Sequence, residues 1–340
     1  MVKIVLLTDG KPGHETQSIG IAKLLNKAQN FEIIKITINK PKKIVQQIFK
    51  RFYNMLSKEW MLSFFLTPEA LKTLNETSDL FYIVSAGGDT LLANALLKKI
   101  LINSNPSLKN IIATSLRGMP ESAYDVVFTI DPHKENQAPY LFYPIAPNKM
   151  VSFNLKQDEI NAKNKLGLNL DQSIVSILLG ADTADVKIGS GSNWLNLIKN
   201  LALQNMTQKY FVCTSRRTPE LLQQELKQEL SLPNVKLILF GQEQGITIQD
   251  LIFSAHSIIC SPDSTSMLSE AIIANKNVIV PLFQNTKLSQ NFQSYYRKMN
   301  PYVMCVEAQE VNELLDSPKF QDQNHVDILQ TKFVQALNLA

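Results

Sequence analysis

A hydroxyl-rich turn at residues 261–266, Ser-Pro-Asp-Ser-Thr-Ser, follows an apolar run and precedes a helical pattern. Free backbone amides at a helix N-terminus, together with hydroxyl groups, can bind phosphate. The phosphate-binding candidates are Asp263, Ser264, Thr265 and Ser266. Glu270 lies four residues after Ser266 on the same helix face, so it could accept hydrogen bonds from a ribose diol while the turn binds a diphosphate. The structural alternative is that Asp263 or Ser264 caps the helix and the other hydroxyls face solvent.

Two adjacent arginines, Arg216 and Arg217, lie in a second junction between an expected strand and an expected helix. Ser215 adds a hydroxyl at the same place. Paired guanidinium groups favour phosphate or carboxylate ligands, because each can donate two parallel hydrogen bonds. The alternative is an ordinary solvent-exposed pair, since arginine is usually exposed.

The segment LLTDGKPGHETQSIG, residues 6–20, passes from an apolar strand through a short loop into a helix expected to begin near Glu15. Gly10 and Gly13 allow a positive φ or a close approach to a ligand, and Gly13 is a candidate for binding the donor phosphates at this loop. His14 can move protons near neutral pH, so it is the candidate catalytic residue. The alternative is an ordinary turn whose histidine only caps the helix.

Two further junctions, Ser85–Thr90 and Leu178–Thr183, each combine glycine, an acid and a hydroxyl. Gly87, Gly180 and Asp182 from these junctions, together with Asp9 and Gly10 from the first loop, are the candidates for lining a cleft. The acids after these strands could instead cap the helices that follow. Neither junction completes a dinucleotide fingerprint or a P-loop, which argues against a nicotinamide enzyme and an ATPase. No histidine has zinc-ligand spacing, so no metal site is expected.

Residues 41–65, PKKIVQQIFKRFYNMLSKEWMLSFF, have a different character, with five basic residues against one acidic residue. A basic amphipathic helix that is rich in aromatic residues can lie in a membrane interface, attracted by anionic lipid. The alternative is a helix that packs on its own sheet with its lysines facing water. Peripheral membrane contact through residues 41–65 is thus one prediction of the sequence.

The composition describes a globular protein with enough apolar residues for a large core. The 340 residues are 45% hydrophobic and 19% charged, with a net charge of +4. This length exceeds the size at which one core usually stops growing, so two domains are expected. Because 34 basic residues nearly balance 30 acidic ones and no basic tail is present, no nucleic-acid partner is expected.

Cysteine usage and the start of the sequence favour a cytoplasmic location. The three cysteines are far apart, odd in number and without metal-ligand spacing, which fits a reducing compartment. The sequence begins with the strand-like MVKIVLLTD instead of a signal peptide, and no apolar run is long enough to span a membrane. We therefore expect a cytoplasmic protein, peripheral at the inner face of the membrane if residues 41–65 bind lipid.

Short β-branched runs, among them Leu80–Ala86 and Ser257–Cys260, alternate with helical patterns along the chain, which predicts α/β domains with parallel sheets covered on both faces. Three prolines within residues 138–149 indicate a connector. The predicted domains are residues 1–150 on the acceptor side and 151–310 on the donor side, with helices at 311–340 that pack back on the first domain. Two facing Rossmann-like domains would bring their strand-end loops to an interdomain cleft.

Three motifs in this order, TDGKPGHETQSIGIAKLL, TSRRTP and SPDSTSMLSEA, resemble a family of mostly bacterial proteins named after the plant mitochondrial fission protein whose loss elongates mitochondria. The family resembles the two-domain GT-B glycosyltransferases, which bind a nucleotide sugar in their C-terminal half. By this resemblance, residues 264–266 lie near the donor phosphates and Glu270 near the ribose. His14 would face the acceptor and the donor sugar, as a general base or an electrostatic support. One departure is Gly88-Asp89, where the family commonly has a basic pair.

The resulting prediction is a metal-independent glycosyltransferase that uses a nucleotide-diphosphate sugar as co-substrate and no other cofactor. Its partners would be the nucleotide sugar and an unidentified acceptor, for which a lipid-linked molecule is one option. A non-catalytic membrane-associated division or scaffold protein with the same fold is the first alternative. A nucleoside-diphosphate-sugar epimerase is the second, but it would need a nicotinamide and a glycine fingerprint that the sequence lacks.

Overall fold

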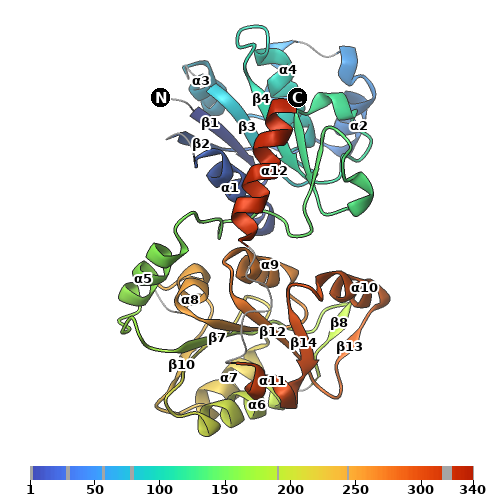
Figure 1. The fold of residues 1–340 in the computed structure, drawn as a ribbon. Coiled ribbons are helices and arrows are strands. Elements are labelled where there is room, and N and C mark those ends of the chain that lie inside the picture. Colours follow the sequence, from blue (N-terminus) through green and yellow to red (C-terminus); the bar gives the residue numbers. More distant parts are fainter. Residues whose placement is uncertain are drawn as a thin grey trace. The chain divides into compact units, whose positions relative to one another are not determined.

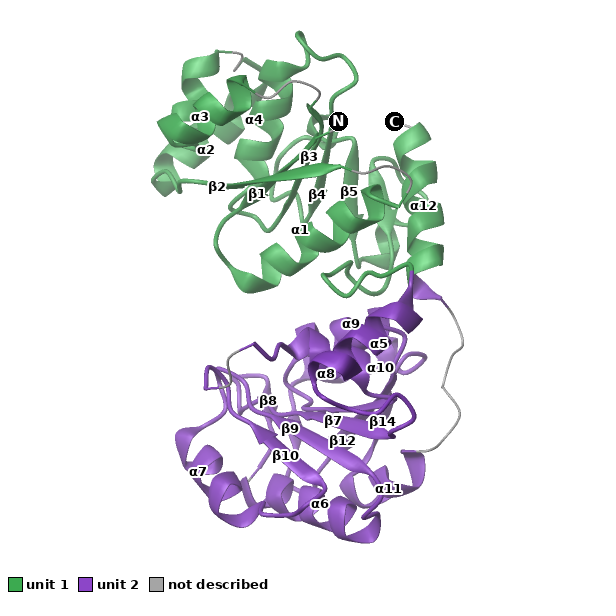
Figure 2. Ribbon diagram, turned by 90° about the vertical axis from the view of Figure 1, so that its left-hand side faces the viewer, with its two compact units in different colours: residues 1–153, 326–340 green, residues 154–325 purple. Residues whose placement is uncertain are grey.

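The computed structural model describes residues 3–27, 31–55, 58–76, 80–189, 191–242, 245–315 and 324–339. Figure 1 shows the fold along the chain, and Figure 2 its two compact units. Unit 1 contains Met1–Phe153 and Val326–Ala340, and unit 2 contains Asn154–His325. Each unit is an α/β domain built on its own parallel sheet.

The described residues of unit 1 form a six-stranded parallel sheet with the order β2-β1-β3-β4-β5-β6. Its strands are β1 (Lys3–Thr8), β2 (Glu32–Thr37), β3 (Leu80–Ala86), β4 (Lys109–Ala113), β5 (Val126–Thr129) and β6 (Tyr140–Phe142). The central strands β1, β3 and β4 are mostly apolar and almost wholly buried, as expected where helices cover both faces. Because β1 pairs with β2 on one side and β3 on the other, the loops after β1 and β3 lie next to each other.

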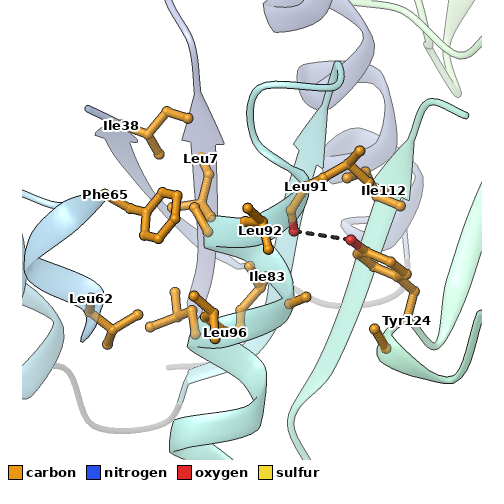
Figure 3. Close-up of a cluster of buried hydrophobic side chains, with 14 of the residues drawn as sticks. Leu7, Ile38, Leu62, Phe65, Ile83, Leu91, Leu92, Leu96, Ile112 and Tyr124 are labelled. Carbon is orange, nitrogen blue, oxygen red and sulfur yellow. Dashed lines mark hydrogen bonds between the residues drawn. The ribbon is translucent and has the colours of Figure 1, made fainter. Parts of the chain in front are cut away.

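The helices of unit 1 cover both faces of this sheet. They are α1 (Pro12–Leu25), α2 (Lys43–Arg51), α3 (Pro68–Asn75), α4 (Leu91–Leu101) and most of α12 (His325–Leu339), with the 3-10 helices η1 (Tyr53–Met55), η2 (Glu59–Phe64), η3 (Glu121–Ala123) and η4 (Pro132–Lys134). Figure 3 shows Ile83 of the sheet with Leu92 and Leu96 of α4, and Leu62 and Phe65 in the same buried cluster. This core anchors the segment between β2 and α3 to the sheet.

The described residues of unit 2 form a second six-stranded parallel sheet with the order β10-β9-β7-β11-β12-β14. Its strands are β7 (Ile174–Leu178), β9 (Lys209–Cys213), β10 (Val235–Ile238), β11 (Ser257–Cys260), β12 (Asn277–Leu282) and β14 (Met304–Glu307). A small antiparallel pair joins β8 (Val186–Lys187) to β13 (Lys287–Leu288). The helices are α5 (Leu155–Lys165), α6 (Gly191–Gln204), α7 (Glu220–Glu229), α8 (Ile248–Ser254), α9 (Thr265–Ile273), α10 (Gln290–Met299) and α11 (Val311–Leu314), with the 3-10 helix η5 (Ala308–Glu310).

The last helix, α12, belongs to unit 1 although it follows unit 2 in the chain. Phe333 packs against Phe128 of β5 with ring centroids 5.1 Å apart, and Lys109 Nζ donates a hydrogen bond to the carbonyl of Leu337. The sequence grouped residues 311–340 as one segment, whereas the structure assigns α11 to unit 2 and α12 to unit 1. The division between the units falls after Phe153, three residues beyond the predicted boundary at residue 150.

Two predicted elements differ from the structure near the candidate site. The first helix begins at Pro12 and not near Glu15, so Gly13 and His14 lie in its first turn. Proline is favoured at the first helical position because its fixed φ suits a helix and its missing N–H would be unpaired there anyway.

Residues 41–65 do not form a single amphipathic helix, but α2, η1 and η2 with Leu56 and Ser57 outside the described residues. Phe49, Tyr53 and Leu62 are all buried in the core of unit 1. On one straight helix Leu62 would point away from the side that carries Phe49 and Tyr53. The segment therefore bends so that both parts can contribute to the core.

The predicted fold class is confirmed: each unit carries a Rossmann-like parallel sheet with helices on its faces. Within the described ranges, no helix is long and apolar enough to cross a membrane.

Candidate functional site

In unit 1, the adjacent strands β1, β3 and β4 all end at the carboxyl edge of the sheet. The loop after β1 carries Asp9 and Gly10 and leads into His14, while the loop after β3 carries Gly87 and the loop after β4 carries Arg117. Ligands of doubly wound sheets bind at this edge, where the strand order reverses. These loops therefore form the candidate site of unit 1.

His14 forms a carboxylate–imidazole pair with Asp9. The Nδ1 atom of His14 lies 2.8 Å from Oδ2 of Asp9, whose side chain is 0% exposed. The other carboxylate oxygen accepts a hydrogen bond from the backbone N–H of Lys11 at 3.1 Å. A buried carboxylate at Nδ1 favours the tautomer that carries its proton there, which leaves Nε2 as a proton acceptor. Because the His14 side chain is 30% exposed, the ring can be reached from solvent.

The His14 ring rests against the backbone of Gly87. Gly87 has a φ of +89°, and a Cβ atom at this position would lie 2.1 Å from His14 Nδ1. The Gly87 amide donates to the carbonyl of Ala113 at 3.1 Å, and the Gly87 carbonyl accepts from the Thr90 hydroxyl at 2.9 Å. Glycine is required here both for the backbone conformation and for the space that the imidazole fills.

Asp89 forms ion pairs with two lysines beside the same loop. Its Oδ2 lies 2.9 Å from Nζ of Lys11 and 2.9 Å from Nζ of Lys40. Hydrogen bonds from Lys11 and then from Lys40 hold the pKa of the Asp89 carboxyl far below its ordinary value. The hydrogen bond to Asp89 likewise raises the pKa of Lys11. Asp89, which stands where the family commonly has a basic residue, thus links the loop after β3 to Lys11 at the start of α1.

Arg117 is a further candidate residue, which the sequence pattern did not predict. Its guanidinium lies over Gly88, where a Cβ atom would come 2.3 Å from Arg117 Cζ. Among the described residues, the exposed Arg117 side chain has no hydrogen-bond acceptor or carboxylate partner. Arg117 and Gly118 have positive φ values of +48° and +85°. This backbone conformation is uncommon for a residue other than glycine, such as Arg117. An Arg-Gly pair in the loop after a buried strand was the available signal.

In unit 2, the adjacent strands β9, β7 and β11 end at the carboxyl edge of the second sheet. Residues 179–182 follow β7, residues 214–218 follow β9, and residues 261–264 follow β11. Three of the predicted motifs therefore meet at one edge, because neighbouring parallel strands end side by side.

Arg217 and Asp263 join two of these loops. Nη2 of Arg217 lies 2.7 Å from Oδ2 of Asp263, an ion pair without the alignment of a hydrogen bond. The Asp263 side chain is 0% exposed and the Arg217 side chain 44% exposed. The Ser261 hydroxyl donates to the other Asp263 oxygen at 2.6 Å, and a Cβ atom on Gly180 would lie 1.8 Å from that oxygen. Gly180 thus leaves room for a buried carboxylate that positions an accessible guanidinium.

Ser215 and Thr218 stabilise the turn at residues 214–218, which we call the arginine turn. The Thr218 hydroxyl accepts from the Ser215 amide at 2.8 Å and lies 3.2 Å from the carbonyls of both Leu179 and Gly180. The Ser215 hydroxyl accepts from the Arg217 amide at 3.3 Å. Ser215 is buried, so its hydroxyl is engaged in the turn, whereas the Arg216 side chain is exposed.

The turn before α9 divides the predicted hydroxyl groups into two kinds. Ser264 is buried and is the N-cap of α9, with its side chain accepting from the Met267 amide at 3.5 Å. Thr265 and Ser266 in the first turn are exposed, and Glu270 is buried. The capping role offered as the structural alternative is therefore present for Ser264, while the next two hydroxyls are open to a ligand.

Asp182 has a local structural partner. Its Oδ1 accepts from the backbone N–H of Ile188 at 2.8 Å, and Nζ of Lys187 lies 3.9 Å from its Oδ2. These contacts fold the loop between β7 and α6. Asp182 therefore shapes the candidate site through its loop.

The structure thus brings Asp9, Gly10, His14 and Gly87 together in unit 1, and the arginine turn, Gly180 and the start of α9 together in unit 2. The joint use of the two sets in one cleft remains a prediction. In the part of the chain that the structure describes, no group of three or more His, Cys, Asp or Glu side chains could hold a metal ion.

Residues 12–326 match the family described as Mitochondrial fission ELM1. No curated protein sequence is detectably similar to the chain.

Three solved structures illustrate the similarity in fold. A UDP-GlcNAc 2-epimerase from Methanocaldococcus jannaschii has a TM-score of 0.57 at 15% identity, covering 100% of this chain and 99% of that one. A putative UDP-N-acetylglucosamine 2-epimerase from Listeria monocytogenes has a TM-score of 0.51 at 10% identity, covering 98% and 91%. The epimerase from Neisseria meningitidis bound to UDP-GlcNAc has a TM-score of 0.50 at 13% identity, covering 100% of both chains. The similarity confirms the expected GT-B-like fold.

Proposed function

Because the chain belongs to the mitochondrial fission ELM1 family and has a fold similar to that of enzymes that act on a nucleotide sugar, we propose that it is itself a sugar-nucleotide enzyme. The specific proposal is a glycosyltransferase that transfers a sugar from a nucleotide-diphosphate sugar to an acceptor hydroxyl in cell-envelope glycan or lipid metabolism. The carrying observation is the buried Asp263 that positions the accessible Arg217 beside the start of α9.

The donor diphosphate would bind at the carboxyl edge of the unit 2 sheet. Arg217 and Arg216 supply positive charge, and the exposed hydroxyl groups of Thr265 and Ser266 lie at a helix N-terminus that favours anions. Asp263 does not contact the diphosphate in this scheme, because it is buried and carries the same sign of charge. Its role is to hold Arg217, and Gly180 provides the space for it.

These groups would also stabilise the departing diphosphate. When the bond between the sugar and the diphosphate breaks, its electron pair moves to the phosphate oxygen, and negative charge grows there. Fixed guanidinium groups and helix amides stabilise such charge without reorganising. In this scheme they replace a metal ion, and the nucleotide sugar is a co-substrate with no further cofactor.

His14 would act as the general base on the acceptor. The acceptor oxygen forms a bond to the sugar, and its proton passes to Nε2 of His14, because Nδ1 is committed to Asp9. Asp9 is then a positioning residue that fixes the tautomer and stabilises the protonated ring.

Calorimetry with uridine, guanosine and cytidine diphosphate sugars tests the donor site. We expect Arg217→Ala to weaken nucleotide binding by about tenfold or more, because a charge-assisted contact to phosphate is lost. Arg297→Ala, which removes an exposed arginine of α10, is the matched control and should bind normally. Absence of binding by the wild-type protein to every nucleotide sugar would favour the non-catalytic scaffold.

Turnover measurements test the base. His14→Ala should lower turnover by about a hundredfold or more while donor affinity survives, because general-base catalysis contributes roughly that much. His133→Ala, which removes an exposed histidine of η4, serves as the control. A collapse of donor affinity in the His14 variant would instead assign His14 to binding.

An epimerase is the second candidate, since two of the three similar structures are UDP-GlcNAc 2-epimerases and the third is a putative one. The distinction is experimental. An epimerase converts UDP-GlcNAc to its 2-epimer without any acceptor, which proton NMR detects directly, whereas a transferase releases UDP only when an acceptor is present.

We also propose that the protein works in the cytoplasm. Cys213, Cys260 and Cys305 are all free thiols, and burial raises the pKa of both Cys213 and Cys305 to about 11. Neutral, partly buried thiols of this kind support packing, in keeping with a reducing compartment.

A further inference from the structure

Unit 1 exposes a group of large apolar side chains on α2, η1 and η2. These side chains are between 39% and 77% exposed: Ile44, Ile48, Phe52, Met55, Trp60 and Phe64. Contiguous exposed apolar groups on a soluble domain usually mark a surface that binds a partner or a membrane. We call this set, together with the basic residues Lys42, Lys43, Lys50, Arg51 and Lys58, the α2–η2 surface.

The apolar stripe of α2 is wider than the core of unit 1 can cover. Ile44, Ile48 and Phe52 follow each other at spacings of four residues and are exposed. Phe49 and Tyr53, one position further along, are buried in the core. One side of the stripe packs inward and the adjacent side faces solvent.

The exposed side chains sit on a segment that is firmly held. The Tyr53 hydroxyl donates to the carbonyl of Ala95 at 3.3 Å, and Lys99 Nζ donates to the carbonyls of Tyr53 and Asn54 at 2.8 Å each. Figure 2 shows α2 beside α4, which carries these partners. The exposure of the surface is therefore a fixed property of the fold.

Aromatic contacts link η2 to α2 within this surface. The Trp60 and Phe64 ring centroids are 5.9 Å apart, and Phe64 lies 5.2 Å from the buried Phe49. Trp60 thus packs against Phe64 while 61% of it remains exposed. Tryptophan at such a position suits a membrane interface, where its apolar body enters lipid and its N–H stays near water.

The charges around the apolar side chains decide the partner. Lys42, Lys43, Arg51 and Lys58 are exposed, and across the described ranges none of them is ion-paired. Glu59 is the single acidic residue within positions 41–65. Unpaired cations around exposed aliphatic and aromatic groups complement anionic headgroups above acyl chains.

We propose that unit 1 binds peripherally to anionic lipid membranes through the α2–η2 surface, with Ile44, Met55 and Trp60 entering the interface and the basic side chains contacting phosphate headgroups. This inference is independent of the sugar-nucleotide function. A protein partner with an acidic rim is the competing occupant, and the test below separates the two.

Vesicle flotation with the full-length protein tests the proposal. We expect flotation with phosphatidylcholine vesicles that contain phosphatidylglycerol, and little with phosphatidylcholine alone. A variant combining Lys42→Glu, Lys43→Glu and Arg51→Glu should bind about a hundredfold more weakly, because each of the three basic residues near an anionic surface contributes roughly a factor of five. Ile44→Ser with Met55→Ser should also bind at least tenfold more weakly.

The control changes the same residue types elsewhere. Leu221→Ser with Lys227→Glu alters exposed positions of α7 in unit 2 and should float like the wild type. Circular dichroism and thermal unfolding of each variant check that the fold is retained. Equal flotation of wild type and surface variants, or no flotation of the wild type, would overturn the proposal, and the second result would favour a protein partner.

Tryptophan fluorescence gives an independent readout at the surface itself. The chain contains two tryptophans, and Trp194 is 2% exposed, so a change on binding reports Trp60. We expect a blue shift with anionic vesicles and quenching by brominated lipid. Trp60→Phe should abolish the shift and retain flotation. An unshifted spectrum in the presence of bound vesicles would show that this surface stays in water and refute the proposal.

Discussion

Replacing Gly87 by alanine tests the proposed positioning of the base most directly. The new Cβ would lie 2.1 Å from His14 Nδ1, so the ring must move to at least 3.4 Å, a shift of 1.3 Å. The backbone of Gly87 cannot easily yield, because Ala113 and Thr90 hold its amide and its carbonyl. The imidazole therefore has to leave its 2.8 Å contact with Asp9.

Two terms contribute to the expected loss of stability. Alanine at a φ of +89° costs about 1 kcal/mol of backbone strain. Loss of the histidine contact leaves the buried Asp9 carboxylate with Lys11 as its remaining partner, which costs about 1–3 kcal/mol. The free energy of unfolding should fall by about 2–4 kcal/mol in total, and turnover by about a hundredfold, because a displacement near 1 Å can cost that much.

Gly118→Ala is the matched control for the strain term alone. Gly118 has a φ of +85°, and a Cβ atom there would have nothing within 4 Å. Chemical denaturation of both variants gives the two free energies, and the NMR chemical shifts of the His14 ring report its environment. Equal destabilisation of the two variants, with unchanged His14 chemical shifts in Gly87→Ala, would refute the claim that glycine makes room for the imidazole.

Three other predictions concern the charged groups of the two sites. Asp263→Asn should weaken nucleotide binding by about tenfold, because the arginine loses the charge that holds it, and calorimetry that shows unchanged affinity would contradict this role. Arg117→Ala should raise the KM for the acceptor with little change in donor affinity, because its guanidinium lies over Gly88 in the loop that contacts His14, whereas an unchanged KM in steady-state kinetics would remove Arg117 from the site. Asp89→Asn should lower stability at neutral pH: the depressed pKa of Asp89 stabilises the fold above the ordinary carboxyl pKa near 4, and this contribution is lost as the pH falls toward the depressed value. Urea denaturation at pH 7 and at successively lower pH checks it, and a difference between wild type and variant that does not shrink on acidification would count against it.

Much of the fold could be predicted because it depends on local patterns. The apolar runs at Leu80–Ala86 and Ser257–Cys260 predicted β3 and β11 with their observed bounds. Short edge strands were missed, among them Tyr140–Phe142, because three residues between prolines show no periodicity. Such strands form only where a neighbouring strand offers hydrogen bonds.

The candidate site was predictable in its residue types and less so in its contacts. The spacing of Asp9 and His14 across a turn gave no sign that the carboxylate is buried against Nδ1. The link between Arg217 and Asp263 depends on two loops that are far apart in sequence and meet only because β9, β7 and β11 are neighbours. Strand order is a tertiary property, so side-chain pairs across it need the structure.

The return of α12 to unit 1 has a consequence for how the chain acquires its shape. The ring of Phe333 packs against Phe128, which is synthesised about two hundred residues earlier. Unit 2 is therefore an insertion within unit 1 in the order of the chain. A chain truncated before α12 would contain every residue of the unit 2 sheet, but the unit 1 sheet would lack its last covering helix. Loss of α12 should therefore destabilise unit 1, which begins the sequence, rather than unit 2, which precedes α12 in the chain.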